Sequence, residues 1–204
     1  MKRVGLLGGA FNPPHQGHLK LAELALNHLE LDEVRFVPTA RSPHKASPEG
    51  SPDAASRMRL LREALAGLTA PFVAEDLELE RGGTSYTVDT LETLSNRDPG
   101  THWVLLLGSD QLSGLASWHR IERVLELAAL AVAPRPGFSL ALPQDLEGRL
   151  RPRWSGAPGE LVWLPGTNLS VSSSSLRDRI LHGEDPKGLS PQVEAAIRRE
   201  NYYR

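Results

Sequence analysis

The segment GGAFNPPHQGHL, residues 8–19, follows directly on a short apolar run at residues 4–7. An apolar run that ends in two glycines is typical of a buried strand that enters a tight turn. Beyond the turn, apolar residues recur at helical spacing: Leu19, Ala22, Leu26 and Leu29. This spacing predicts an amphipathic helix over residues 17–30. The chain is therefore expected to open with the strand, turn and helix of an α/β domain.

The rest of the chain continues the alternation of strands and helices. Apolar runs predict strands at residues 33–37, 72–74, 77–79, 103–107, 130–133 and 161–164. Helical patterns cover residues 53–68, 87–94, 111–128 with a break near Ala116, 174–181 and 191–200. Residues 42–52 are rich in proline and predict a mobile loop, and residues 135–159 predict no defined element.

This alternation predicts a Rossmann-like α/β fold, a mainly parallel sheet with helices on both faces. The 204 residues suffice for one sizeable domain or for two small ones that share a cleft. We expect a single domain, residues 1–204, whose C-terminal part from about residue 165 is helical. In such sheets, ligands bind beyond the carboxyl ends of the strands.

The composition excludes several classes of function. The net charge of -2 lacks the basic excess of proteins that bind duplex nucleic acid. The absence of cysteine excludes disulfides, zinc sites built on thiolates and a cysteine nucleophile. The N-terminus runs directly into a strand pattern, and no apolar stretch approaches the ~20 residues of a membrane span. A cytoplasmic location is expected.

The glycine turn carries the first chemical signal. It matches neither GxGxxG nor GxxxxGK[ST]. Glycines allow backbone N–H groups to approach a phosphate closely, and His15 and His18 lie three apart at a helix start, so both can face one side. Gly17 is expected to leave room for a ligand. Beside a polyphosphate the histidine pKa is expected to rise, because anionic oxygens favour imidazolium, which can stabilise a leaving pyrophosphate.

Two other interpretations of the glycine turn stay open. The turn can be a plain tight turn with solvated histidines. It can also be a metal site, although no cysteine exists and no carboxylate lies in the segment to complete a zinc site. We expect phosphate chemistry and no metal-ligating residue.

A serine run, residues 172–175, precedes a helical pattern with Arg177. Serines at a helix start cap exposed N–H groups, and the same groups can bind phosphate oxygens. A flexible linker is the alternative. With the histidines upstream, the two segments resemble the H-x-G-H and I-S-S-T-x-I-R signatures of the nucleotidyltransferase superfamily, which includes adenylyltransferases and cytidylyltransferases. Ser172, Ser173 and Arg177 match the second signature by position, and the resemblance assigns it to the ATP phosphates.

Three further stretches concern the second substrate. In RGGTSYTVDTL, residues 81–91, Ser85 or Thr87 is predicted to cap a helix whose positive end suits a small carboxylate. Asp110 follows a buried strand and can accept hydrogen bonds from ribose, or it can cap a helix. Trp118 can stack on a heteroaromatic ring, although core packing is the commoner use of tryptophan.

Together these stretches resemble the bacterial nicotinate mononucleotide adenylyltransferases. The blocks S-Y-T-x-D-T-L and G-x-D-x-x-x-x-L-x-x-W are nearly intact, and residues 42–45 and 135–138 resemble the P-P-H-K and R-P-G-[YF] elements. The resemblance implies a set of ATP-binding residues, with His15 and His18 catalytic: Gly8, Gly9, Ala10, Phe11, His15, His18, Gly108, Asp110, Ser172, Ser173 and Arg177. It implies a second set for nicotinate mononucleotide: Lys45, Ser85, Tyr86, Thr87, Val88, Trp118, His119 and Arg135.

Roles within the second set follow from the same resemblance. Trp118 stacks on the pyridine ring, and Thr87 with the N–H groups around Val88 and His119 binds the carboxylate. Lys45 and Arg135 are candidates for the acceptor phosphate, and Asp110 for a ribose.

The implied reaction joins ATP and nicotinate mononucleotide to give nicotinic acid adenine dinucleotide and pyrophosphate, a step of NAD biosynthesis. Mg²⁺ would accompany ATP, the partners would be small molecules without nucleic acid or membrane, and a homo-oligomer stays open. Two departures from the family are Ala10 for a common Thr or Ser, and Asn12 for a common Asp. A phosphopantetheine adenylyltransferase and a nucleotide-binding regulatory protein without turnover are the alternatives.

Overall fold

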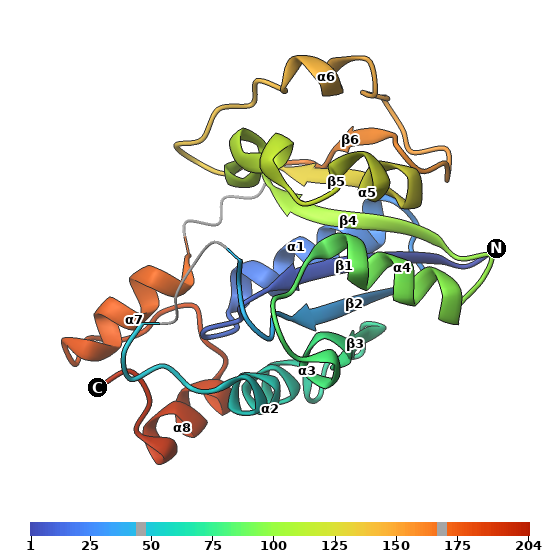
Figure 1. Ribbon diagram of the computed structural model, residues 1–204. Helices are drawn as coiled ribbons and strands as arrows, with labels where there is room; N and C mark the ends of the chain where they lie inside the picture. The colour runs from blue at the N-terminus through green and yellow to red at the C-terminus, as the bar shows by residue number, and fades with distance from the viewer. Residues whose placement is uncertain (44–47, 167–170) are drawn as a thin grey trace.

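The computed structural model describes residues 1–43, 48–166 and 171–204 (Figure 1). Its centre is one six-stranded sheet with the order β3-β2-β1-β4-β5-β6, in which every pair of neighbours is parallel. The strands are β1 (Arg3–Gly9), β2 (Glu33–Pro38), β3 (Phe72–Ala74), β4 (His102–Gly108), β5 (Ala128–Ala133) and β6 (Leu161–Trp163). The predicted α/β fold with a parallel sheet is confirmed.

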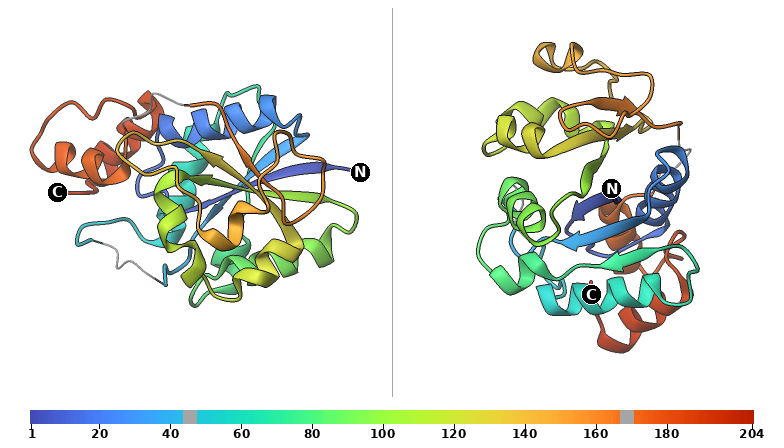
Figure 2. Two further views of the ribbon diagram at one scale, coloured as in Figure 1. Left: turned by 90° about the horizontal axis from the view of Figure 1, so that it is seen from above. Right: turned by 90° about the vertical axis from the view of Figure 1, so that its right-hand side faces the viewer.

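Helices connect the strands and cover both faces of the sheet. They are α1 (Gln16–His28), α2 (Ala54–Leu65), α3 (Leu77–Arg81), α4 (Thr87–Arg97), the 3-10 helix η1 (Ser109–Ser117), α5 (Ile121–Leu127), α6 (Gln144–Glu147), α7 (Ser173–Leu181) and α8 (Pro191–Glu200). The right-hand view of Figure 2 shows α1 and α4 on opposite sides of the sheet.

The alternation of side chains along β4 explains the two-sided core. Leu105 and Leu107 pack with α4 and α5 on one face, where Leu91 and Val124 are fully buried. Val104 and Leu106 belong to the opposite face, which α1 and α2 cover. Because both faces are buried, the central strands are almost continuously apolar, as expected of a parallel sheet.

The strand order changes direction at β1. The chain proceeds from β1 to β2 on one side, and later places β4 on the other side of β1. The carboxyl ends of β1 and β4 therefore diverge into different loops and leave a crevice between them, the usual place for a ligand in such sheets.

A third apolar cluster joins the C-terminal helices to α2. It includes Leu60 of α2, Leu176 of α7, Val193 and Ile197 of α8, and Tyr203 near the end of the chain. Figures 1 and 2 show α7 and α8 at the end of the molecule opposite the N-terminus, which is the end where the parallel strands finish. The C-terminal helices therefore lie near the loops that follow β1.

The expected strand at residues 77–79 was wrong, because these residues begin the helix α3. Leucines alternate with glutamates there, which imitates a half-exposed strand. In the structure the polar member, Glu78, is itself buried, and Gly82 ends the helix with a φ of 66°. The hydrogen-bonding partners of Glu78 decided the local structure, and the alternation of apolar residues did not.

Two other boundaries differ from the sequence prediction. The break predicted near Ala116 falls between Ser117 and Ile121, where Arg120 adopts a left-handed φ of 53°. Ala128 belongs to β5 and not to the preceding helix. The segment without a predicted element contains the short helix α6. In the described part of the chain, no helix is both long and apolar enough to cross a membrane.

Candidate active site

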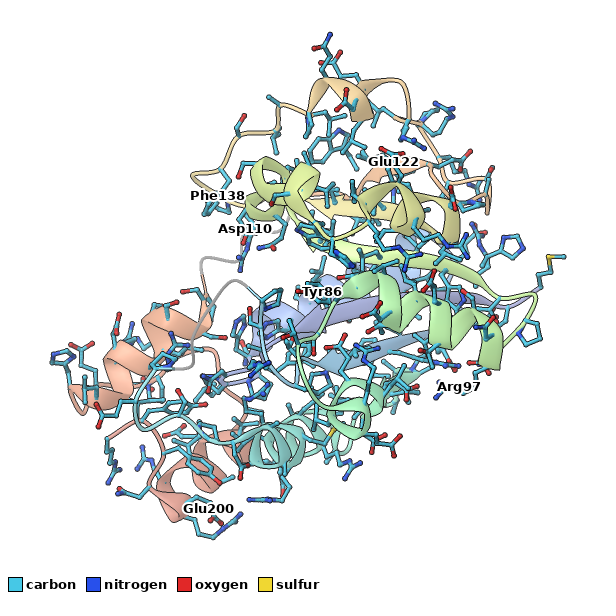
Figure 3. All side chains as sticks on the ribbon, in the orientation of Figure 1. Tyr86, Arg97, Asp110, Glu122, Phe138 and Glu200 are labelled. Carbon is cyan, nitrogen blue, oxygen red and sulfur yellow. The ribbon has the colours of Figure 1, made fainter. Side chains whose placement is uncertain are left out.

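A cavity of about 430 Å³ lies at the carboxyl ends of β1 and β4. This volume suits a small-molecule ligand. It gathers most of the residues predicted to bind ligands: Gly8, Gly9, Ala10, His15, His18, Ser85, Tyr86, Thr87, Gly108, Asp110, Trp118, His119 and Arg135. Figure 3 shows the labelled Asp110 and Tyr86 at this end of the sheet, from opposite sides of the opening.

The loop after β1, residues 8–18 and here called the glycine loop, forms one wall of the cavity. No described atom would lie within 4 Å of a Cβ at Gly8, so the glycine leaves its backbone open to a ligand. Phe11 is buried and its ring packs edge-on against His18, with ring centroids 4.8 Å apart. Phe11 therefore packs against the ring of His18, and its side chain does not line the cavity.

His15 and His18 form a reciprocal cap at the start of α1. The Nδ1 atom of His15 accepts a hydrogen bond from the N–H of Gly17 at 3.1 Å. The Nδ1 atom of His18 accepts one from the N–H of His15 at 3.2 Å, and the two rings stack with centroids 3.7 Å apart. Because both Nδ1 atoms accept, the proton of each neutral ring is on Nε2, which leaves Nε2 as a donor.

Both histidines are neutral in the ligand-free protein. Burial, with a smaller contribution from the cation of Arg135, lowers the pKa of His15 to about 4. Burial, then His15 and Arg135, holds the pKa of His18 well below its ordinary value. The rise expected beside a polyphosphate is therefore reversed when no anion is present, because desolvation and a neighbouring cation both oppose the charged ring.

Gly17 has a structural purpose beside the one expected. A Cβ on Gly17 would lie 2.8 Å from the His15 ring, from both Nδ1 and Cε1. The glycine therefore allows the ring of His15 to fold back over the start of α1. Gly17 also lines the cavity, and its expected purpose of leaving room for a ligand stays a prediction.

Asp110 and Arg135 form an ion pair on a second wall of the cavity. Arg135 Nη1 lies 3.2 Å from Asp110 Oδ2, and the backbone N–H of Arg135 donates to Ser109 Oγ at 2.9 Å. A Cβ at Gly108 would clash with both side chains, so the glycine allows the pair to form at the end of β4. Partly exposed ion pairs contribute little stability, which makes this pair easy to exchange for a bound anion.

The start of α4, residues 85–88 and here called the α4 turn, forms the remaining wall. The sequence predicted that Ser85 or Thr87 would cap this helix. That prediction was wrong, because Tyr86 is the N-cap residue. Ser85 Oγ instead accepts a hydrogen bond from the N–H of Ala40 at 3.0 Å. Tyr86 makes no side-chain capping bond within the described part of the chain, so the first N–H groups of α4 keep their donor capacity.

Two aromatic groups lie beside this helix start. The rings of Tyr86 and His119 have centroids 4.6 Å apart, and Trp118 is partly buried against the apolar core of that face while it lines the cavity. A flat indole with one face in the cavity is available for stacking on a ring.

Glu78 lines the same wall and was missed at the sequence level. Its Oε1 accepts a 2.7 Å hydrogen bond from Thr90 Oγ1, and it is also hydrogen-bonded with Ser85. Burial raises the pKa of the Glu78 carboxyl, although the bonds from Thr90 and Ser85 oppose the rise. The only signal in the sequence was an acidic residue among apolar ones, which also fits an exposed strand face.

Arg57 was also missed. Its side chain is 5 % exposed, and its guanidinium donates to backbone carbonyls: to Ala10 at 2.6 Å, to Thr39 at 2.6 Å and to Ala40 at 3.2 Å. Arg57 therefore joins the glycine loop to the end of β2. An arginine in an amphipathic helix gives no sequence signal for this contact.

The serine run begins α7 as predicted, with Ser172 as the capping residue. Ser173 Oγ donates to the carbonyl of Pro13 at 3.0 Å, and Arg177 Nη1 donates to the carbonyl of Asn12 at 2.8 Å. Ser172, Ser173, Arg177 and Val88 do not line the cavity as the described residues form it. The serine run and Arg177 therefore contact the backbone of the glycine loop without lining the cavity. Lys45 lies outside the described residues.

Comparison with known proteins agrees with this arrangement. Residues 6–179 match the cytidylyltransferase-like family. The probable nicotinate-nucleotide adenylyltransferase of Bordetella petrii is 38 % identical over 210 residues, and the alignment covers 100 % of both proteins. The corresponding protein of Halalkalibacterium halodurans is 36 % identical over 207 residues, which cover all of this chain and 92 % of that protein.

Among solved structures, a Plasmodium falciparum nicotinic acid mononucleotide adenylyltransferase complexed with NaAD superposes with a TM-score of 0.79. It is 19 % identical, and the match covers 100 % of this chain and 98 % of that one, which supports the fold. Because the curated relatives match over the full length of both proteins, this chain belongs to the nicotinate-nucleotide adenylyltransferase family within the cytidylyltransferase-like nucleotidyltransferases.

Proposed function

We propose that this protein transfers AMP from ATP to nicotinate mononucleotide, giving nicotinic acid adenine dinucleotide and pyrophosphate in NAD biosynthesis. The observation that carries the proposal is the composition of the single cavity described above. Two Nε2–H donors on the glycine loop face an uncapped helix start and Trp118. Such a cavity offers donors for a polyphosphate at one wall and for an aromatic carboxylate at another.

The glycine loop binds the donor substrate, ATP. The N–H groups of Gly8, Gly9 and Ala10 and the Nε2–H groups of His15 and His18 donate to its phosphates. Ala10 has no hydroxyl to add, so its contribution comes from the backbone. A neutral imidazole is a sufficient donor for first binding, and the approaching phosphates then raise the histidine pKa and strengthen the interaction.

The α4 turn binds the acceptor, nicotinate mononucleotide. Trp118 stacks on the pyridine ring, and the N–H groups of Thr87 and Val88, with that of His119, receive the carboxylate. A positive helix end favours a carboxylate over a neutral amide. This preference is the reason to propose the nicotinate form as the substrate and not the nicotinamide form.

The Asp110–Arg135 pair lies between the two halves. We propose that the acceptor phosphate binds to Arg135 and Lys45 and replaces Asp110 as the partner of Arg135. Asp110 is then available to accept hydrogen bonds from the ribose hydroxyls. The exchange costs little, because the pair is partly exposed with side-chain exposures of 33 % for Arg135 and 19 % for Asp110.

The reaction itself needs alignment more than proton transfer. A phosphate oxygen of the acceptor attacks the α-phosphorus of ATP, and the bond to the bridging oxygen of pyrophosphate breaks with its electron pair. The acceptor phosphate is mostly dianionic at neutral pH, since its second pKa is ~6, so no strong general base is required. His15 and His18 stabilise the charge that develops on the departing pyrophosphate.

Mg²⁺ enters as part of the ATP substrate. The described residues contain no group of three His, Asp or Glu side chains able to hold a metal ion. Of the two carboxyls in the cavity, Glu78 is engaged by Thr90 and Asp110 by Arg135. This set of carboxyls would suit a Mg²⁺ that arrives bound to the ATP phosphates, where it would offset their negative charge. A cytoplasmic location and a homo-oligomeric state stay predictions.

Pyrophosphate release on mixing with MgATP and each candidate acceptor tests the proposal. Nicotinate mononucleotide should give the highest kcat/KM. The value for nicotinamide mononucleotide should be lower by about tenfold or more, which corresponds to the loss of one charge-assisted hydrogen bond. Equal values for the two would contradict the role of the helix start. Turnover with phosphopantetheine alone, or binding of ATP without any turnover, would contradict the proposed reaction.

A further inference from the structure

We infer that Tyr203, the penultimate residue, is a positioning residue that holds the glycine loop in shape through Asn12. The inference rests on the proposed function for one point only, that the glycine loop binds ATP. It assigns a purpose to the end of the chain, which lies outside the residues that line the cavity.

The contact between Tyr203 and the loop is short and buried. The hydroxyl of Tyr203 donates to Oδ1 of Asn12 at 2.7 Å, and the two residues are 4 % and 5 % exposed. The amide nitrogen of Asn12 donates to Ser51 Oγ at 3.0 Å, so both the oxygen and the nitrogen of the side-chain amide are hydrogen-bonded. Asn12 directly follows the four loop residues that start at Gly8, so its position fixes one end of that turn.

The C-terminal part of the chain surrounds the glycine loop at several points. Arg177 and Ser173 donate to the carbonyls of Asn12 and Pro13. The carbonyl of Gly188 accepts a hydrogen bond from the N–H of Gln16 at 2.8 Å. Tyr203 is the contact that reaches a loop side chain, whereas the others reach the backbone. The C-terminal segment therefore packs directly onto the glycine loop.

The backbone around Tyr203 is specifically arranged for this contact. After α8, Asn201 and Tyr203 both adopt left-handed φ values, 56° and 65°. Asparagine commonly takes this conformation at the end of a helix, as Asn201 does at the end of α8, whereas it is uncommon for tyrosine. The N–H of Tyr203 donates to the carbonyl of Gly50 at 3.0 Å, and the ring packs in the cluster of α2, α7 and α8.

Burial of the Tyr203 hydroxyl keeps it protonated and therefore a donor. Burial raises the pKa of Tyr203, and this outweighs the opposing effect of the Arg177 and Arg57 cations. The phenol therefore stays protonated at neutral pH and donates to the amide oxygen, the geometry that the 2.7 Å contact requires. Removal of the hydroxyl would leave a buried acceptor without a partner, which is the costly half of a lost hydrogen bond.

The test is the Tyr203→Phe variant of the full chain, with Tyr202→Phe as the matched control. Phenylalanine keeps the ring that packs in the cluster and removes only the hydroxyl. In Tyr203→Phe the KM for ATP should rise about fivefold to tenfold, the effect of one buried hydrogen bond, while the KM for nicotinate mononucleotide stays within about twofold. Tyr202→Phe should match the wild type, because among the described residues its hydroxyl makes a single long contact, accepting from the exposed Arg59 at 3.5 Å.

A second variant separates positioning from simple loss of stability. Asn12→Ala removes the other partner and leaves the C-terminal ring in place. It should reproduce the increase specific to ATP, and Tyr203→Phe should then have no further effect on the KM for ATP in the Asn12→Ala background. Additive effects, an unchanged KM for ATP in Tyr203→Phe, or an equal loss for both substrates would each overturn the inference.

Calorimetric titration with MgATP alone makes the result independent of the reaction. A wild type that binds ATP but releases no pyrophosphate with any acceptor contradicts the proposed function, and the Tyr203→Phe titration still decides this inference. Wild-type ATP affinity in Tyr203→Phe overturns the proposed positioning by Tyr203. A loss of ATP affinity of about fivefold to tenfold, the size expected for one hydrogen bond, supports it. Circular dichroism at the assay temperature verifies that each variant is folded.

Discussion

The glycine loop and the α4 turn form facing walls of one cavity, but different parts of the chain hold them. Arg57 of α2, Ser173 and Arg177 of α7, and Tyr203 at the chain end all contact the glycine loop. The α4 turn relies on the end of β2 and on Glu78, seven residues before Ser85. The wall proposed to bind ATP is thus held by several elements, α2, α7 and the segment after α8. The wall proposed to select the acceptor depends on the segment after β2 and on Glu78.

This difference has a consequence for substitutions. A change behind the glycine loop should alter ATP binding or the whole fold, because several elements meet there. A change in the α4 turn should alter the choice of acceptor and leave ATP binding intact. The two walls can therefore be separated experimentally by measuring KM for both substrates in every variant.

The largest effect is expected for His18→Ala. Loss of one donor to the developing pyrophosphate should lower kcat by about 100-fold to 1000-fold, the range measured when a single donor to a developing oxyanion is removed. Steady-state kinetics with both substrates measures it. His28→Ala, an exposed histidine at the other end of α1, is the control and should be close to the wild type. Near-normal turnover of folded His18→Ala would show that the ring does not act on the reaction.

Arg57→Met should be the next largest effect, and it concerns stability. The variant leaves the carbonyls of Ala10, Thr39 and Ala40 without their buried donor, which should lower the free energy of unfolding by about 2–4 kcal/mol. Urea unfolding measures this change. Arg62→Met removes an exposed arginine of the same helix whose partner is Asp76, and should cost at most about 1 kcal/mol. Equal losses in the two variants would contradict the long-range anchoring of the glycine loop.

Trp118→Ala tests the acceptor wall. Loss of a stacking ring should lower kcat/KM for nicotinate mononucleotide by about 10-fold to 100-fold, if stacking on the pyridine resembles stacking on a nucleobase. The KM for ATP should stay unchanged, in contrast to the variants behind the glycine loop. Trp118→Phe keeps a smaller ring and should fall in between. An equal loss for ATP and the acceptor would mean that Trp118 serves the core and not the ligand.

The sequence predicted the fold and most of the cavity, because these depend on local patterns. The apolar run before Gly8 and the repeat of strands and helices decided the parallel sheet, and the place where the strand order reverses follows from that topology. The histidines and Asp110 lie close after the carboxyl ends of strands, so their positions predicted that they would meet at one cavity. Trp118 ends η1, and only its motif indicated that it belongs to the same site.

Two of the residues that were missed contact the glycine loop from distant positions in the sequence. Arg57 lies 47 positions from Ala10, and Tyr203 lies 191 positions from Asn12. Neither contact has a local pattern, since an arginine on a helix and a tyrosine near a terminus are ordinary surface residues. Glu78 was misplaced because the alternation around it imitated a strand. Only the three-dimensional structure shows these contacts.

The smallest effect expected concerns pH, and it probes the glycine loop without bound ATP. The pKa of His15 is about 4 in the folded protein and near 6.5 when the chain is unfolded. Between these values the unfolded chain binds a proton that the folded protein refuses, so stability should fall as pH falls from about 6.5 to about 4. His18 shifts in the same direction and should add to the slope. Glu78 has a raised pKa, so its stabilising effect is lost as pH rises above its ordinary value of 4.5, and it opposes the slope in the lower part of this window.

Urea unfolding across this pH range, with and without MgATP, measures the effect. Bound phosphates favour the imidazolium, so ATP should flatten the slope as the folded pKa values rise toward the unfolded ones. The Glu78→Gln variant removes the opposing group and should steepen the slope of the ligand-free protein above about pH 4.5. A slope that ATP leaves unchanged would mean that the phosphates do not reach His15 and His18. The glycine loop would then be only a rigid wall of the cavity, and the difference between the two walls would lie in their anchoring and not in the ligands that they bind.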